Sequence, residues 1–91
     1  MIWSHFLISW YTLTNMPTIL RQDGFEVMIY TRDHEPPHVH VWYGRTELVI
    51  NLDPLEVREN NGMQPNRSRN AFDIVASHQT ELLIAWRKIH P

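Results

Sequence analysis

Residues 38–51 read HVHVWYGRTELVIN, and this stretch decides the fold. Apolar and polar side chains alternate on both sides of Gly44-Arg45, a dipeptide that suits a type II′ turn with glycine first. The alternation gives the hairpin two distinct faces, because neighbouring side chains of a strand point to opposite sides. The predicted pairs are Tyr43–Thr46, Val41–Leu48 and Val39–Ile50 on an apolar face, and Trp42–Glu47, His40–Val49 and His38–Asn51 on a polar one.

A second hairpin is predicted before this one, over residues 18–22 and 25–31. Asp23-Gly24 is a two-residue signal for a type I′ turn. The turn predicts the pairs Gln22–Phe25, Leu20–Val27 and Thr18–Ile29, with Arg21 opposite Glu26 as a charge pair. The polar, proline-bearing run 31–37 then connects the two hairpins as a loop.

The chain after residue 51 predicts a short strand and a long helix. Asp53-Pro54 ends the preceding strand, 55–57 suits a short edge strand, and 59–63 suits a turn. Pro65 or Asn66 opens a helix, whose core-facing stripe recurs at three- and four-residue steps: Ala71, Phe72, Val75, Gln79, Leu82, Trp86 and Ile89. We therefore expect an α+β domain, a small antiparallel β-meander of about four strands packed against one long C-terminal helix.

Residues 1–15, MIWSHFLISWYTLTN, differ in composition from the rest and contain no Lys, Arg, Asp or Glu. The stretch is shorter than the roughly 20 apolar residues that span a bilayer, and it lacks the positive start of a signal peptide. It suits an extra strand, an interfacial anchor, or translated sequence upstream of a true start at Met16. We favour the last, because the organised pattern begins at Met16, and we expect 16–91 to form a single domain.

Bulk composition narrows the class of protein. The 91 residues are 43% hydrophobic, which suits one small globular domain. A net charge of −2 with six neutral histidines argues neither for nor against a nucleic-acid partner. The lack of cysteine excludes disulfides, thiolate catalysis and cysteine-ligated zinc. We expect a cytoplasmic protein with no membrane partner.

Three histidines gather at the start of the central hairpin. His34, His38 and His40 have the spacing His-x3-His-x-His, and the last two share one strand face. Imidazoles are common ligands of transition metals, and three of them with an open position suit a catalytic ion. We name zinc or nickel as candidates, with His34 folding back from the loop and with Asn51, Asp53 or His78 as a further ligand or orienting group. Surface histidines in a recognition or structural role are the alternative.

Metal-free acid–base catalysis is a further alternative for the same stretch. His38 and His40 with Glu35 supply an acid and a base, and Arg32 or Arg45 would lie near a phosphate. Two aromatic residues, Trp42 and Tyr43, are candidates for stacking on bases, although packing is the commoner role of such residues. Near the helix start, Arg67 and Arg69 sit against the helix dipole and are candidates for anion binding.

Several segments resemble the bacterial domain of unknown function 4160 family, over residues 16 to the end. They are Met16-Pro17-Thr18-Ile19, Asp23-Gly24-Phe25, Glu35-Pro36-Pro37-His38-Val39-His40-Val41, Leu52-Asp53-Pro54 and the terminal stretch from His78 to Trp86. The Glu-Pro-Pro-His-Val-His core is the specific part. The resemblance implies no established activity. It does imply gene neighbours of the domain of unknown function 2442 family, in arrangements like toxin–antitoxin pairs, and hence a small partner protein.

Two functions follow as hypotheses. The first is a toxin–antitoxin-type protein-binding module that binds its small partner through an exposed sheet edge or the histidine face. The second is a histidine-centred enzyme, a nuclease or metal-dependent hydrolase, that uses His34, His38 and His40. The sequence leaves the substrate, the metal and the side of a toxin–antitoxin pair open.

Overall fold

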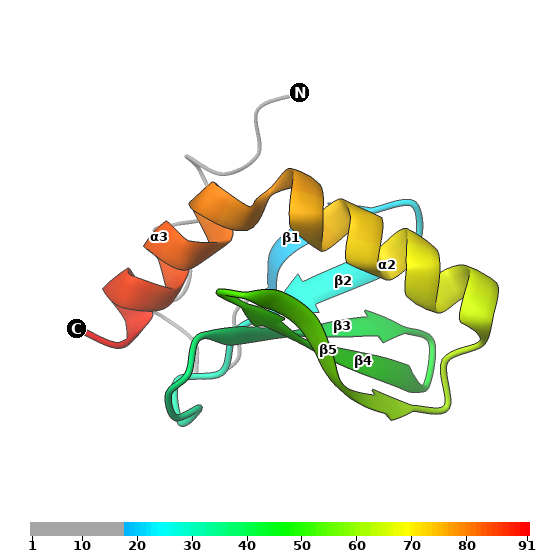
Figure 1. The fold of residues 1–91 in the computed structure, drawn as a ribbon, viewed down its shortest axis with the longest axis horizontal. Coiled ribbons are helices and arrows are strands. Elements are labelled where there is room, and N and C mark those ends of the chain that lie inside the picture. The colour runs from blue at the N-terminus through cyan, green and yellow to red at the C-terminus, as the bar shows by residue number, and fades with distance from the viewer. Residues whose placement is uncertain (1–17) are drawn as a thin grey trace.

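The computed structural model describes residues 18–91, so the predicted extension at residues 1–15 lies outside the described residues. It contains the strands β1 (Thr18–Gln22), β2 (Phe25–Met28), β3 (His38–Tyr43), β4 (Thr46–Leu52) and β5 (Leu55–Asn61), then the helices α2 (Pro65–Ser77) and α3 (Gln79–Ile89). The strands form one antiparallel sheet in the order β1-β2-β3-β4-β5. Both helices lie along one face of that sheet (Figure 1). The predicted α+β class is confirmed, with five strands in place of about four.

The β3–β4 hairpin has the predicted register at all six pairs, from His38 with Asn51 to Tyr43 with Thr46. Of the two turn residues only Gly44 has a positive φ, of 58°, as a type II′ turn requires. Four members of the predicted apolar face are completely buried at the centre of the core: Val39, Val41, Leu48 and Ile50. The pair Tyr43–Thr46 near the turn is partly exposed.

The β1–β2 hairpin departs from the prediction at its open end. Pairing follows the predicted register from Gln22–Phe25 to Leu20–Val27, but Thr18 pairs with Met28, and β2 ends there. The intervening Ile19 is an extra residue on β1, a β-bulge. The bulge lets Ile19 and its neighbour Leu20 both be buried, which strict alternation does not allow.

The fifth strand is longer than predicted. β5 runs through residues 59–61, for which the sequence predicts a turn, and its ladder with β4 continues to the pair Leu48–Asn60. Asn60 does form a turn, but after the strand, at Met63. The Asn60 side chain accepts a hydrogen bond from the Met63 N–H and donates one to the Met63 carbonyl. A second bulge places Arg58 opposite no residue of β4.

The predicted single helix is two helices that meet at His78. The backbone N–H of His78 donates to the carbonyl of Val75. The carbonyl of Ile74 accepts instead from the His78 ring, at 2.9 Å, and the Ser77 hydroxyl donates to the carbonyl of Asp73. Side chains thus compete with the backbone ladder at this point and end α2.

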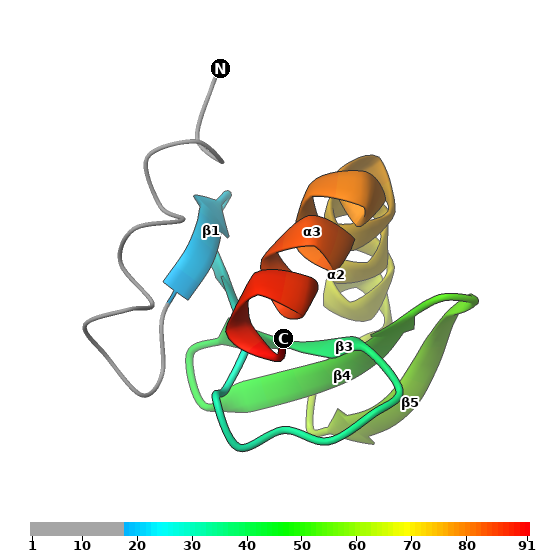
Figure 2. The same cartoon turned by 90° about the vertical axis from the view of Figure 1, so that its left-hand side faces the viewer.

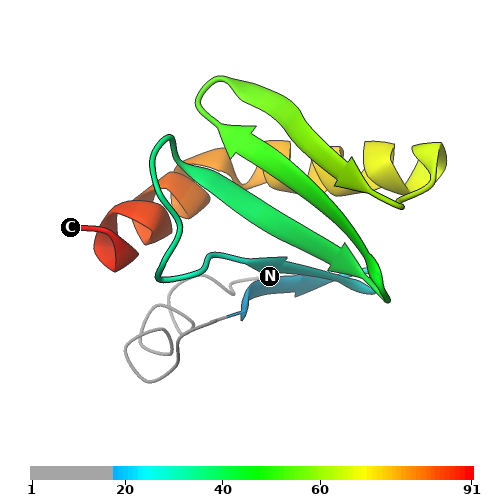
Figure 3. The same cartoon turned by 90° about the horizontal axis from the view of Figure 1, so that it is seen from below.

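Both helices nevertheless bury the predicted stripe. Ala71, Val75, Leu82 and Trp86 are buried, while Phe72, Gln79 and Ile89 are partly covered. Seen from below, the sheet lies in front of the helices, and the loop between β2 and β3 lies beside the end of α3 (Figure 3). Within residues 18–91, no helix combines the length and the apolar character needed to cross a membrane.

Candidate metal centre

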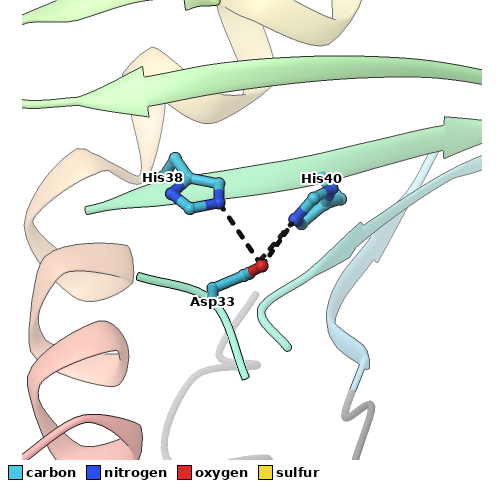
Figure 4. Close-up of side chains that lie close together, drawn as sticks. All are labelled: Asp33, His38 and His40. Atoms are coloured by element: carbon cyan, nitrogen blue, oxygen red, sulfur yellow. Dashed lines mark hydrogen bonds and ion pairs between the residues drawn. The ribbon is translucent and has the colours of Figure 1, made fainter. Parts of the chain in front are cut away.

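Two histidines of β3 and one aspartate of the preceding loop point toward one another (Figure 4). His38 and His40 lie two positions apart on the strand, so their rings share a face of the sheet. The Nε2 atom of His40 lies 3.1 Å from the Asp33 carboxylate, and that of His38 lies 3.5 Å from it. All three side chains are largely buried, with 5% of His38 and 13% of each of the others exposed.

The other nitrogen of each ring is held by an acceptor. His38 Nδ1 lies 2.9 Å from the carbonyl oxygen of Pro36, and His40 Nδ1 lies 2.7 Å from the Glu47 carboxylate. Because neither oxygen carries a proton to donate, each Nδ1 is the donor. In a neutral imidazole the Nε2 lone pair would then face an ion beside Asp33. Without an ion, the 3.1 Å hydrogen bond from His40 Nε2 to the Asp33 carboxylate needs a proton on that nitrogen. Hydrogen bonds like those of Nδ1, from the ring nitrogen that does not bind the metal, orient the imidazoles of metal sites.

The carboxylates of the group are themselves fixed. The backbone N–H of Tyr30 donates to Asp33 Oδ2 at 3.1 Å, while the N–H of Asp33 donates back to the Tyr30 carbonyl. On β4, Glu47 accepts a second hydrogen bond from the Asn61 amide at 2.8 Å. The turn from Tyr30 to Asp33 therefore fixes the Asp33 carboxylate, and a hydrogen bond from β5 to β4 fixes the Glu47 carboxylate.

The spacing of the three ligand atoms fits a transition-metal ion. Bonds of about 2.0–2.1 Å at tetrahedral angles put ligand atoms about 3.3 Å apart. From a single carboxylate oxygen, Asp33 Oδ1, the Nε2 atoms of His40 and His38 lie 3.2 and 3.5 Å away, close to this value. All three ligand atoms lie within 4.8 Å of one another.

Two aromatic residues border the group. The Tyr30 ring stacks on His40 with centroids 4.2 Å apart, and its hydroxyl accepts from the Trp42 indole N–H at 2.8 Å. Burial is the largest cause that raises the pKa of Tyr30; the Trp42 hydrogen bond opposes it, and the Glu47 and Asp33 charges add to it. The phenol therefore stays neutral beside two carboxylates.

The loop residues predicted to act with the histidines lie elsewhere. His34 is exposed and is not a member of the group; its neighbour Asp33 takes the position predicted for it. The Glu35 carboxylate accepts from the Trp86 indole N–H at 3.2 Å. Arg32 is exposed on the loop. The predicted acid–base set is thus not assembled around Glu35.

The remaining candidates are distributed over the sheet and helices. Arg45 is exposed at the β3–β4 turn, and Asp53 is exposed after β4. The Asn51 side chain bonds Glu56 and Arg58, and the ring of His78 bonds Ile74 at the helix junction. Tyr43 packs against Phe25, and the Arg67 guanidinium lies 4.1 Å from its ring centroid. Arg67 is nevertheless exposed and Tyr43 partly exposed, so both side chains remain accessible at the surface.

Two members of the arrangement were missed by sequence reasoning. Glu47 lies diagonally across from His40 on the predicted polar face, so the correct register already carried the signal. Asp33 depends on the turn that begins at Tyr30, and an aspartate in a polar loop gives no comparable signal.

A family model described as "Domain of unknown function (DUF4160)" matches residues 24–87, which is more than half of the chain. The chain belongs to this family. Neither a curated protein nor a solved structure matches the chain. The description of DUF4160 assigns no activity, so the function of this member is argued from the geometry of its site.

Proposed function

We propose that the protein is a metal-dependent hydrolase whose ion, zinc or nickel, is bound by Asp33, His38 and His40. The observation that carries the proposal is the convergence of both Nε2 atoms on one carboxylate while both Nδ1 atoms donate elsewhere. Two imidazoles and a carboxylate are a known ligand set of catalytic zinc, and they leave a position open for water.

Charge balance also supports a bound cation. The side chains of Asp33 and Glu47 are only 13% and 14% exposed, and buried carboxylates need compensating positive charge. Their hydrogen-bond partners among the described residues are the two histidines, the Asn61 amide and the Tyr30 N–H, none of which is permanently charged. One divalent ion, or protonation of both imidazoles, supplies the two missing charges.

The residues around the ion would each have a defined task. A bound zinc ion lowers the pKa of its water to about 7 and polarises a carbonyl or phosphoryl oxygen. Glu47 fixes the tautomer of His40, the Pro36 carbonyl fixes that of His38, and Asp33 supplies a negative ligand. Ester, amide and phosphodiester bonds are the corresponding substrates, and cleavage of a phosphodiester in a nucleic acid would make the protein a nuclease.

Metal binding is the first test. We expect the full chain and a His34→Ala control to bind one zinc ion, measured by calorimetry with a competing chelator. His38→Ala/His40→Ala and Asp33→Ala should each lose affinity by more than about 100-fold, because the loss of a ligand exceeds the 10- to 100-fold effect of outer partners. Stoichiometric binding that survives Asp33→Ala, or no binding by the wild type, would contradict the proposed centre.

Hydrolysis is the second test. Induced expression in a bacterial host, followed by assays of growth and RNA integrity, compares the wild type with His38→Ala/His40→Ala. Growth arrest and RNA cleavage by the wild type alone would assign a nuclease. Intact RNA with both proteins would contradict a nuclease and direct the assay to ester and amide substrates.

The family resemblance supports a second proposal, a toxin–antitoxin-type module that binds a small protein of the domain of unknown function 2442 family. The observation that favours it is β5, an edge strand with six of seven residues exposed. The outer edge of such a strand can pair with a partner strand. Co-purification should be lost in Val57→Lys, since a charged side chain on an edge opposes pairing. A protein that stays alone at micromolar concentrations of both would refute this proposal.

A further inference from the structure

The end of α3 lies against the segment that carries the candidate ligands (Figure 2). The Trp86 ring lies 5.2 Å from the ring of His38, centroid to centroid, and the His90 ring stacks on Trp86 at 3.9 Å. Trp86 is 1% exposed, and its indole N–H donates to Glu35. The chain terminus thus contacts both the first strand ligand and the loop before it.

A second contact joins His90 to Tyr30, where the loop between β2 and β3 begins. His90 Nε2 lies 3.0 Å from the Tyr30 carbonyl oxygen. That carbonyl also accepts from the N–H of Asp33, in the turn that places the aspartate. The two α3 contacts therefore fall on Tyr30 and Glu35, on either side of Asp33.

We infer that Trp86 and His90 are positioning residues of the metal centre, so that docking of α3 and metal binding are one coupled event. The inference rests on the proposed function. Neither residue is a ligand; they act through the loop and through the face of His38. Coupling between two sites is reciprocal, so a bound ion must strengthen the docking of α3 by the factor by which docking strengthens binding.

The variants must separate positioning from simple core packing. Trp86→Ala would open a cavity in the core, so Trp86→Phe is the better change, because it keeps a ring and removes the N–H that reaches Glu35. His90→Phe keeps a ring for the stack on Trp86 and removes the ring's hydrogen bonds to the carbonyls of Tyr30 and Trp86. Lys88→Ala is the matched control, since Lys88 is exposed on the same turn of α3.

Zinc titration of the full-length variants measures the coupling directly. We expect zinc affinity to fall about 10-fold in His90→Phe and in Trp86→Phe, at temperatures where both are folded, and to be unchanged in Lys88→Ala. Amide hydrogen exchange is the second readout. Zinc should slow exchange in residues 79–89 of the wild type, and this protection should shrink in His90→Phe, which a purely structural role does not predict.

The outcomes distinguish the inference from the proposed function. Wild-type zinc binding with unchanged affinity in both ring variants would overturn the coupling and leave the metal centre standing. Zinc binding that leaves exchange in α3 unaltered would overturn it as well. Failure of the wild type to bind zinc would refute the proposed function and this inference together.

Discussion

Both faces of the β3–β4 hairpin contain buried side chains, but these are buried by different means. On one face, Val41 and Leu48 have no exposed surface and belong to the same core cluster as Val75 and Leu82 of the helices. On the other, His38 is nearly as well buried, yet its neighbours are carboxylates, carbonyls and aromatic rings. Apolar burial needs only hydrophobic side chains at the right period, whereas polar burial needs every charge and hydrogen bond to be matched. The first face therefore supports the fold, and the second is suited to chemistry.

Leu48 and Glu47 are neighbours in sequence that serve opposite faces, so they separate the two roles. Leu48→Ala should lower the free energy of unfolding by about 2–5 kcal/mol, because it leaves a cavity in a completely buried core. Urea denaturation measures the change. Zinc affinity of the folded variant should stay at the wild-type value, and a large loss of affinity would show that the faces are not separable.

Glu47→Gln is the converse change. Zinc affinity should fall 10- to 100-fold, or about 1.4–2.7 kcal/mol. The Glu47 carboxylate can only accept from His40 Nδ1, whereas the amide of Gln can also donate to Nδ1 and so no longer fixes the His40 tautomer. Competition calorimetry measures it, with the exposed Glu59→Gln on β5 as the control. Equal affinities in the two variants would remove Glu47 from the centre.

The smallest effect is expected from Tyr30, which connects the polar face to its aromatic border. Its pKa is raised above the ordinary value of 10.0, chiefly by burial, so the folded protein holds the phenol proton more tightly than the unfolded chain does. The resulting stability is fully present below about pH 10 and is lost as the pH rises toward the folded pKa. Urea midpoints measured from neutral pH to above pH 10 should therefore fall more for the wild type than for Tyr30→Phe. Parallel pH profiles would contradict the shift.

The parts of the fold that follow local rules were predictable. Gly44 and the strict alternation around it determine the β3–β4 register, and Asp23-Gly24 determines most of the first hairpin. The bulge at Ile19 and the break at His78 were not predictable, because each depends on tertiary packing or on a side chain that competes with the backbone. Helical periodicity continues through His78 and conceals that break.

The candidate site divides in the same way. Alternation placed His38 and His40 on one face, and the register placed Glu47 diagonal to His40. The choice between Asp33 and His34 depended on the conformation of one loop, which the tendency of imidazole to bind metals cannot decide. Trp86 looked like an ordinary core residue because its indole N–H leaves no trace in a hydrophobic pattern.

The distances along the chain between contacting residues suggest an order of assembly during folding. The three candidate ligands lie between residues 33 and 40, so a short loop closure brings them together at small entropic cost. The contacts from α3 instead span 51 positions to Glu35 and 60 to Tyr30. Local contacts form sooner than distant ones, so the three ligands would approach one another before the contacts of Trp86 and His90 form, and those later contacts would then fix their positions.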